Sequence, residues 1–126
     1  MKLRPFFGFN LILAIFFGVG CTLFPHLLAS FYQLTLNEAG AWATRMVGGS
    51  FLAFSTLIWF GIRIGSLQAR RAIAFALLVN EVIGLVASIE IKIIAPMNTL
   101  GWINPVLFGI LALGHIYFLF IKPANS

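Results

Sequence analysis

The stretch that decides the fold is RRAIAFALLVNEVIGLVASIEIKIIA, residues 70–95. Its apolar part, residues 72–94, predicts a helix long enough to cross the hydrocarbon core of a bilayer, which is about 30 Å thick. The helix follows a pair of arginines and carries Asn80 and Glu81 near its middle. A carboxyl group at that depth is costly, so we interpret Glu81 as the centre of a candidate site.

The composition of the whole chain supports a membrane location. Of its 126 residues, 61% are hydrophobic and only 9% are charged, whereas roughly a quarter of the residues in an ordinary soluble domain are charged. A soluble domain of this size has too little interior to bury so much apolar surface. We therefore predict an integral membrane protein.

The charge and the cysteine content exclude several kinds of partner and site. The formal net charge is +5, but the 8 basic residues are scattered and form no phosphate-binding patch, so we predict no nucleic-acid binding. Cys21 is the single cysteine, which excludes an internal disulfide and a metal site built from several cysteines. No residue spacing in the chain matches a metal-binding motif, and we predict no metal site.

Three further stretches have the length and polarity of membrane spans, namely residues 5–24, 42–62 and 102–121. We interpret the first as a retained helix and not as a secretory signal, because its apolar run exceeds the usual ~7–15 residues and no small-residue cleavage site follows. After it, Pro25 and apolar residues at near-helical spacing favour a short helix in the membrane interface. We predict one all-α domain, residues 1–126: an integral membrane four-helix bundle, up-down-up-down, with an interfacial helix after the first span.

The basic residues also predict the orientation of the bundle. Lysine and arginine collect on the cytoplasmic side of membrane spans. Most of them lie on the side that holds both termini and the connector between the second and third spans, so we expect that side to face the cytoplasm. The residues on that side are Lys2, Arg4, Arg63, Arg70, Arg71 and Lys122, and those toward the other side are Arg45 and Lys92.

Polar side chains of all four spans fall at similar depths. Counting about 1.5 Å per helical residue from the cytoplasmic ends places them in the inner half of the bilayer, where they turn away from lipid. We therefore expect a buried cluster of Asn10, Thr56, Asn80, Glu81 and His115. Glu81 would keep its proton or share it with His115. The pair could bind the polar end of a lipophilic ligand, relay a proton or hold a cofactor, or Glu81 could simply join helices by hydrogen bonds.

Two other hypotheses concern single residues of the spans. Arg45 and Glu90 lie at matched depths on antiparallel helices, so we predict a structural ion pair between them. His115 could also serve as an axial ligand of haem or chlorophyll. We do not favour that interpretation, because no second histidine lies at a matching depth and His26 lies toward the opposite side.

The run LNEAGAWATRMVGGSFLAFSTLIWFGIR, residues 36–63, is followed by a basic connector, the third span, NTLGW at residues 98–102 and a final apolar span. In this order the chain resembles small four-helix bacterial inner-membrane proteins of the DoxX-like and related families. Arg45 ahead of Gly48 and Gly49 matches their habit of an arginine before a small-residue helix. The resemblance implies the fold and a bacterial membrane location, and it implies no reaction.

Three classes of function follow from these observations. The leading hypothesis is a non-enzymatic accessory or structural subunit of the bacterial cytoplasmic membrane, whose partners are the bilayer and other membrane subunits or further copies of the chain. The alternative is a binder or carrier of a small lipophilic or protonatable ligand that uses Glu81 and His115. The third is a membrane oxidoreductase component with a cofactor on His115. A cavity beside Glu81 would favour the ligand class, and a visible-light spectrum the cofactor class.

Overall fold

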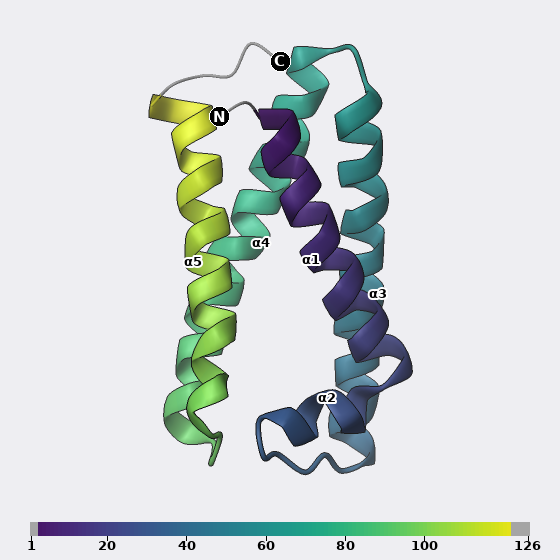
Figure 1. Ribbon diagram of the computed structural model, residues 1–126, viewed down its shortest axis with the longest axis vertical. Coiled ribbons are helices and arrows are strands. Elements are labelled where there is room, and N and C mark those ends of the chain that lie inside the picture. Colours follow the sequence, from purple (N-terminus) through teal and green to yellow (C-terminus); the bar gives the residue numbers. More distant parts are fainter. Residues whose placement is uncertain (1–2, 122–126) are drawn as a thin grey trace.

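The computed structural model describes residues 3–121, and within these residues it contains helices and no strand (Figure 1). Four helices in the described part of the chain are long and apolar enough to cross a membrane, which confirms the predicted fold class. A short helix follows the first of them, as predicted. The elements are α1 (Leu3–Leu23), α2 (Pro25–Phe31), α3 (Glu38–Arg63), α4 (Leu67–Ile94), the 3-10 turn η1 (Thr99–Trp102), α5 (Ile103–Ile116) and the π-type turn η2 (Tyr117–Ile121).

The helices α3 and α4 begin about one turn before the predicted spans because polar residues cap them. The side chain of Asn37 accepts a hydrogen bond from the backbone N–H of Gly40 at 2.7 Å. The hydroxyl of Ser66 accepts one from the backbone N–H of Ala69 at 3.2 Å. These bonds satisfy backbone donors that the first turn of a helix leaves free. A capped first turn is polar, so the apolar pattern alone does not reveal it.

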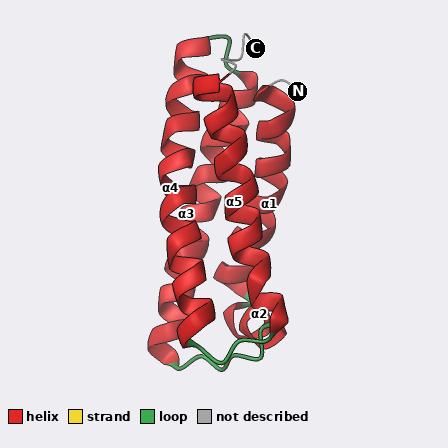
Figure 2. Cartoon of the chain, turned by 90° about the vertical axis from the view of Figure 1, so that its left-hand side faces the viewer, coloured by secondary structure: helices red, strands yellow, loops and turns green. Residues whose placement is uncertain are grey.

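The bundle consists of two helix pairs. The helix α1 packs along α3 and α4 packs along α5, whereas the two pairs contact each other less extensively. All four long helices run roughly along one axis, with the connection between α3 and α4 at one end and α2 at the other (Figures 1 and 2). We refer to these as the connector end and the α2 end.

The close approach of α1 to α3 depends on Gly48. A Cβ atom at this position would overlap the hydroxyl oxygen of Thr22 in α1 and lie 2.7 Å from the backbone nitrogen of the same residue. A Cβ atom on Gly49 would meet nothing within 4 Å, and Ala53 is exposed. Of these three small residues in α3, Gly48 is therefore the one that lets α1 approach closely.

An apolar core fills the connector end of the bundle. Side chains from the first turns of α1, the second half of α3, the first half of α4 and η2 meet there. Phe7 and Ile58 in this core are 0% exposed. Toward the α2 end a cavity separates the helix pairs. The apolar core therefore joins the two pairs mainly in the half of the bundle at the connector end. The core residues include Leu3, Phe6, Phe7, Ile58, Ala74, Leu77, Phe118 and Leu119.

Arg70 has a structural role that its position in a basic connector did not reveal. Its side chain is buried, and its Nε donates a hydrogen bond to the carbonyl oxygen of Gly61 at 3.0 Å. Its Nη2 donates to the carbonyl oxygen of Ile64 at 2.5 Å. Arg70 thus binds carbonyl groups at the end of α3 that lack partners within the helix. Lys2 and Lys122, two other residues of the predicted cytoplasmic side, lie outside the described residues.

Candidate functional site

Three polar side chains from three helices meet, with Glu81 between Asn10 and His115. Glu81 in α4 is 2% exposed, and each of its carboxyl oxygens has a partner. The Nδ2 of Asn10 in α1 donates a hydrogen bond to Oε1 at 3.1 Å. The Nδ1 of His115 in α5 lies 2.7 Å from Oε2. The structure therefore brings together three of the five residues of the predicted cluster, and their hydrogen bonds link the two helix pairs.

The surroundings of His115 decide where its ring carries a hydrogen. Its Nδ1 also lies 3.0 Å from the carbonyl oxygen of Leu111, and a carbonyl oxygen only accepts hydrogen bonds, so the hydrogen belongs on Nδ1. The Nε2 atom is buried without a hydrogen-bond partner among the described residues. It belongs to a ring whose centroid lies 4.8 Å from that of Phe6 and 6.0 Å from that of Phe7. A hydrogen on Nε2 would therefore find no acceptor among the described residues.

This arrangement does not fit His115 as an axial ligand of haem or chlorophyll. An axial ligand must present a nitrogen lone pair to a space large enough for the macrocycle. The Nδ1 of His115 is engaged by Glu81, its Nε2 is enclosed beside phenylalanine rings, and the residue does not line the cavity. Within residues 3–121 there is also no group of three His, Cys, Asp or Glu side chains that could hold a metal ion.

The other two residues of the predicted cluster do not contact Glu81. Thr56 is exposed, and its hydroxyl donates to the carbonyl oxygen of Leu52 in its own helix at 3.1 Å. Its neighbour Ser55 is the buried hydroxyl residue. Asn80 is half-buried and lines the cavity. Depth counting gives a residue's height along a helix but not its direction, which turns by about 100° from one residue to the next.

The predicted ion pair between Arg45 and Glu90 is not formed. Both residues are exposed. Among the described residues, the one contact at ion-pair distance is that of Glu81 with His115, whose ring is charged only when protonated. Matched depth was not enough, because α3 and α4 belong to different helix pairs and the cavity separates them at this end of the bundle.

A cavity of about 560 Å³ lies between the two helix pairs, with Glu81 in its wall. This volume is within the range of small-molecule sites, about 300–1,000 Å³. Apart from Ser50 of α3, the polar side chains of the wall lie at two levels, one midway along the bundle and the other toward the α2 end. The middle level comprises Asn10, Asn80 and Glu81, the other level comprises Tyr32, Ser88 and Asn104, and the wall between them includes Phe17, Phe51, Phe54 and Phe108.

The cavity opens sideways between α3 and α4. Val47 and Ser50 of α3 line the cavity and are also exposed on the outer surface, and so are Ile83 and Ile91 of α4. In a bilayer, exposed apolar side chains of spanning helices face the acyl chains. The open side of the cavity therefore faces the region that acyl chains would occupy.

At the α2 end, hydrogen bonds join the end of α2 to the residues before and within α5, and these bonds hold α2 over the cavity. The phenol of Tyr32 lies 3.1 Å from Oδ1 of Asn104. Burial raises the pKa of the Tyr32 phenol, so the phenol keeps its hydrogen and donates it to Asn104. The side chain of Asn98 donates to the carbonyl oxygen of Phe31 at 2.8 Å, and its backbone N–H donates to the carbonyl oxygen of Tyr32 at 3.2 Å. Sequence reasoning missed these contacts, because nothing local connects residues so far apart.

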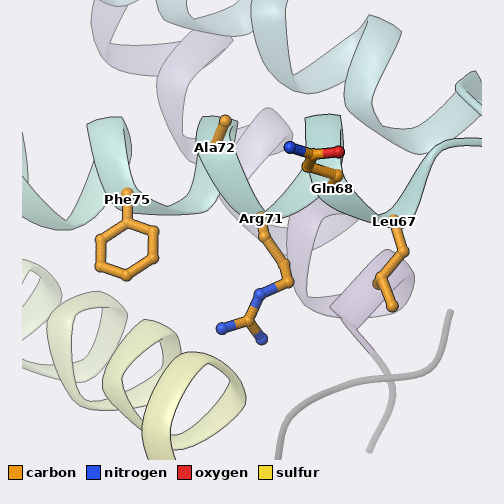
Figure 3. Close-up of a pocket in the computed structure, with 5 residues that line it drawn as sticks. All are labelled: Leu67, Gln68, Arg71, Ala72 and Phe75. Carbon is orange, nitrogen blue, oxygen red and sulfur yellow. The ribbon is translucent and has the colours of Figure 1, made fainter.

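A second hollow, of about 440 Å³, lies on α4 at the connector end (Figure 3). Arg71 and Phe75 project from the same side of α4 (Figure 3). The Nη2 of Arg71 donates a hydrogen bond to the carbonyl oxygen of Leu119 at 3.1 Å. All the residues that line this hollow belong to the first turns of α4. Because its arginine already binds a carbonyl group of η2, we interpret the hollow as part of the packing between α4 and η2.

Comparisons of the chain with protein-family models, with curated proteins and with solved structures found no match. The resemblance to DoxX-like proteins therefore stays a prediction. The cavity and the hydrogen bonds of Glu81 are the observations on which a function can be proposed.

Proposed function

We propose that the protein binds a small lipophilic molecule, which enters the cavity from the bilayer between α3 and α4 and places a polar group against Glu81. The observation that carries this proposal is a buried, hydrogen-bonded carboxyl group in the wall of a largely apolar cavity of ligand size. Sites for small molecules combine such an apolar wall with a few convergent polar groups.

The position of Glu81 supports ligand binding over helix packing alone. A residue that only joins helices would be expected in a close-packed interface, where no space remains beside it. Glu81 instead borders an open volume, and its two protein partners hold the carboxyl group in a fixed direction. A carboxyl group inside a membrane is costly, and access to a ligand is a reason to retain it.

The hypothesis of an accessory or structural subunit has less support. The chain is a multi-pass membrane protein with four candidate spans in its described part. Apolar side chains are exposed on all four of them, including Ile12, Trp42, Ile93 and Val106. Contact with lipid requires this surface whether or not other subunits are present, so the surface does not favour a protein partner. The cavity favours the ligand class, as a binder or a carrier.

We further propose a bacterial inner membrane as the location, with the connector end in the cytoplasm. Arg4, Arg63, Arg70 and Arg71 lie in the first turn of α1 and in the turns that flank the α3–α4 connection. A reporter fused to either terminus is expected to be active in the cytoplasm, and one inserted beside Asn37 is expected to be active outside. Labelling of a cysteine at position 37 from the cytoplasmic side alone would contradict this orientation.

Ligand binding is tested with decan-1-ol that carries a photoreactive diazirine, applied to the protein in lipid nanodiscs. We expect labelling of the cavity residues Phe51 and Phe108 to saturate and to be suppressed by unlabelled decan-1-ol. Labelling of Ile12 and Ile93, which are 69% and 72% exposed toward lipid, is expected to rise without saturation. Mass spectrometry of peptides measures both. Labelling of the cavity residues that rises without saturation, as on the outer surface, would overturn the proposed function.

Two neighbouring variants provide a matched control. Ala87 lines the cavity on the open side, so Ala87→Phe is expected to fill the entrance and to remove the saturable labelling. Val86 is 63% exposed and does not line the cavity, so Val86→Phe is expected to retain it. Equal labelling of both variants would contradict entry between α3 and α4.

A further inference from the structure

We infer that the ligand of this cavity is a lipophilic cation of the protonated-amine class, and that its binding displaces one proton from the Glu81–His115 pair. The inference rests on the proposed function, because it specifies the chemical class of the molecule that the cavity binds. Three features carry it: the hydrogen-bond partners of Glu81, the unpartnered nitrogen of His115 and the composition of the cavity wall.

The partners of Glu81 are arranged for its ionised form. Asn10 donates to one carboxyl oxygen and His115 to the other, at 3.1 and 2.7 Å. Donors on both oxygens complement a carboxylate, whereas the hydrogen of a carboxylic acid must occupy one of the remaining lone-pair directions. Each carboxylate oxygen has a further lone pair, and the amide oxygen of Asn10 accepts no hydrogen bond from the described residues. The cavity side of the site therefore offers acceptors, and a protonated amine supplies donors.

The unpartnered Nε2 of His115 prevents the protein from balancing the charge by itself. An imidazolium could neutralise the carboxylate of Glu81, but it carries an N–H on both nitrogens. The Nε2 atom has no acceptor and the residue is 0% exposed, so a charged ring would bury an unsatisfied N–H. The neutral ring leaves the carboxylate without a counter-charge. A proton on the carboxyl group supplies that balance when the cavity is empty, and a cation supplies it when the cavity is filled.

The cavity wall favours a cation over an anion or a neutral molecule. Glu81 is the acidic residue of the wall, and among residues 3–121 no lysine or arginine lines it. The rings of Phe17, Phe51, Phe54 and Phe108 also line it, and aromatic rings attract a cation placed over their faces. A protonated alkylamine fits both parts, because its charged end complements Glu81 and its chain occupies the apolar space that opens to lipid.

Other titratable groups around the cavity do not replace the ligand as a counter-charge. Cys21 of α1 and Tyr32, the residue after α2, line the wall, and α3 contributes no titratable residue to it. His115 of α5 contacts Glu81 but does not line the cavity. Cysteine and tyrosine are neutral near pH 7. Binding of a protonated amine therefore breaks the O–H bond of the Glu81 carboxyl group, forms an N–H···O hydrogen bond in its place and releases the carboxyl proton to the bulk solvent.

The test compares three probes with the same alkyl chain: decylamine, decan-1-ol and decyl sulfate. Each competes with the diazirine-bearing decan-1-ol in nanodiscs of zwitterionic lipid, so that the membrane surface itself does not concentrate the amine. We expect decylamine to suppress labelling of Phe51 at a concentration at least about tenfold lower than decan-1-ol does, and decyl sulfate to suppress it least.

The release of one proton on amine binding is tested by repeating the competition experiment at several pH values. Between about pH 6 and pH 8 an alkylamine stays protonated, as lysine does. Because binding releases one proton, decylamine is expected to compete more strongly as the pH rises, by up to about tenfold per pH unit. Competition by decan-1-ol is expected to stay constant. Glu81→Gln is expected to remove both the preference for the amine and its pH dependence. Glu90→Gln, at an exposed position of the same helix, is expected to retain both.

The outcomes separate the inference from the proposed function. Saturable labelling with equal competition by amine and alcohol, or with no effect of pH, would overturn the cation inference while the proposed function stands. A preference for the amine that survives in Glu81→Gln would also overturn it. Labelling that never saturates would overturn the proposed function itself. Because the pH dependence is measured on the unchanged protein, the inference stays testable even if Glu81→Gln does not fold.

Discussion

Replacing Glu81 by leucine is expected to lower the free energy of unfolding by about 1–3 kcal/mol and to abolish the preference for decylamine. Leucine cannot accept the hydrogen bond from Asn10, and it leaves Nδ1 of His115 with the carbonyl oxygen of Leu111 as its remaining partner. The Asn10 amide and the His115 ring stay buried in the variant, so each keeps its desolvation cost without the hydrogen bond to Glu81 that offset it. Unfolding in mixed detergent and dodecyl sulfate micelles, followed by circular dichroism, measures the change in stability.

Two variants separate the hydrogen bonds from the charge. Glu81→Gln is expected to change stability by less than about 1 kcal/mol, because the new amide oxygen accepts from His115 and its amide N–H donates to Asn10 once that side chain turns over. Glu90→Leu is expected to cause no measurable loss, since Glu90 is exposed and forms no ion pair with a described residue. If Glu90→Leu destabilises the protein as much as Glu81→Leu, the buried hydrogen bonds contribute nothing.

Replacing Gly48 by leucine is expected to cost about 3 kcal/mol, at the upper end of the range for an overpacked interior. The new Cβ atom would overlap Thr22 and meet its backbone nitrogen at 2.7 Å, and a backbone atom cannot rotate away. The helix α1 must therefore move away from α3. Because α1 carries Asn10, the same movement is expected to weaken the site at Glu81 and to reduce competition by decylamine.

Gly49→Leu is the matched control for this substitution. The position is adjacent on α3, and a Cβ atom there meets nothing within 4 Å. We expect stability to stay unchanged or to rise by up to about 1 kcal/mol, because leucine favours a helix more than glycine does. The same micelle titration measures both variants. Equal losses in Gly48→Leu and Gly49→Leu would show that α1 and α3 do not pack through Gly48.

The sequence by itself determined the four apolar helices of span length and the depths of the polar residues that meet at Glu81. Apolar runs of span length are a local property, so the helices could be located before their packing was known. Depth along a helix is also local, since each residue adds about 1.5 Å. Polar residues at similar depths avoid lipid, and this reasoning correctly brought Asn10, Glu81 and His115 together.

Only the tertiary structure decided which face each residue occupies and which helices pair. Thr56 has a suitable depth but is exposed, whereas Ser55 beside it is buried. Arg45 and Glu90 have matched depths but lie on helices of different pairs, and the cavity keeps these helices apart. Helix pairing depends on contacts between distant parts of the chain, such as Gly48 against Thr22. The space left between the pairs is a property of the whole bundle, so no segment of the sequence could reveal the cavity beside Glu81.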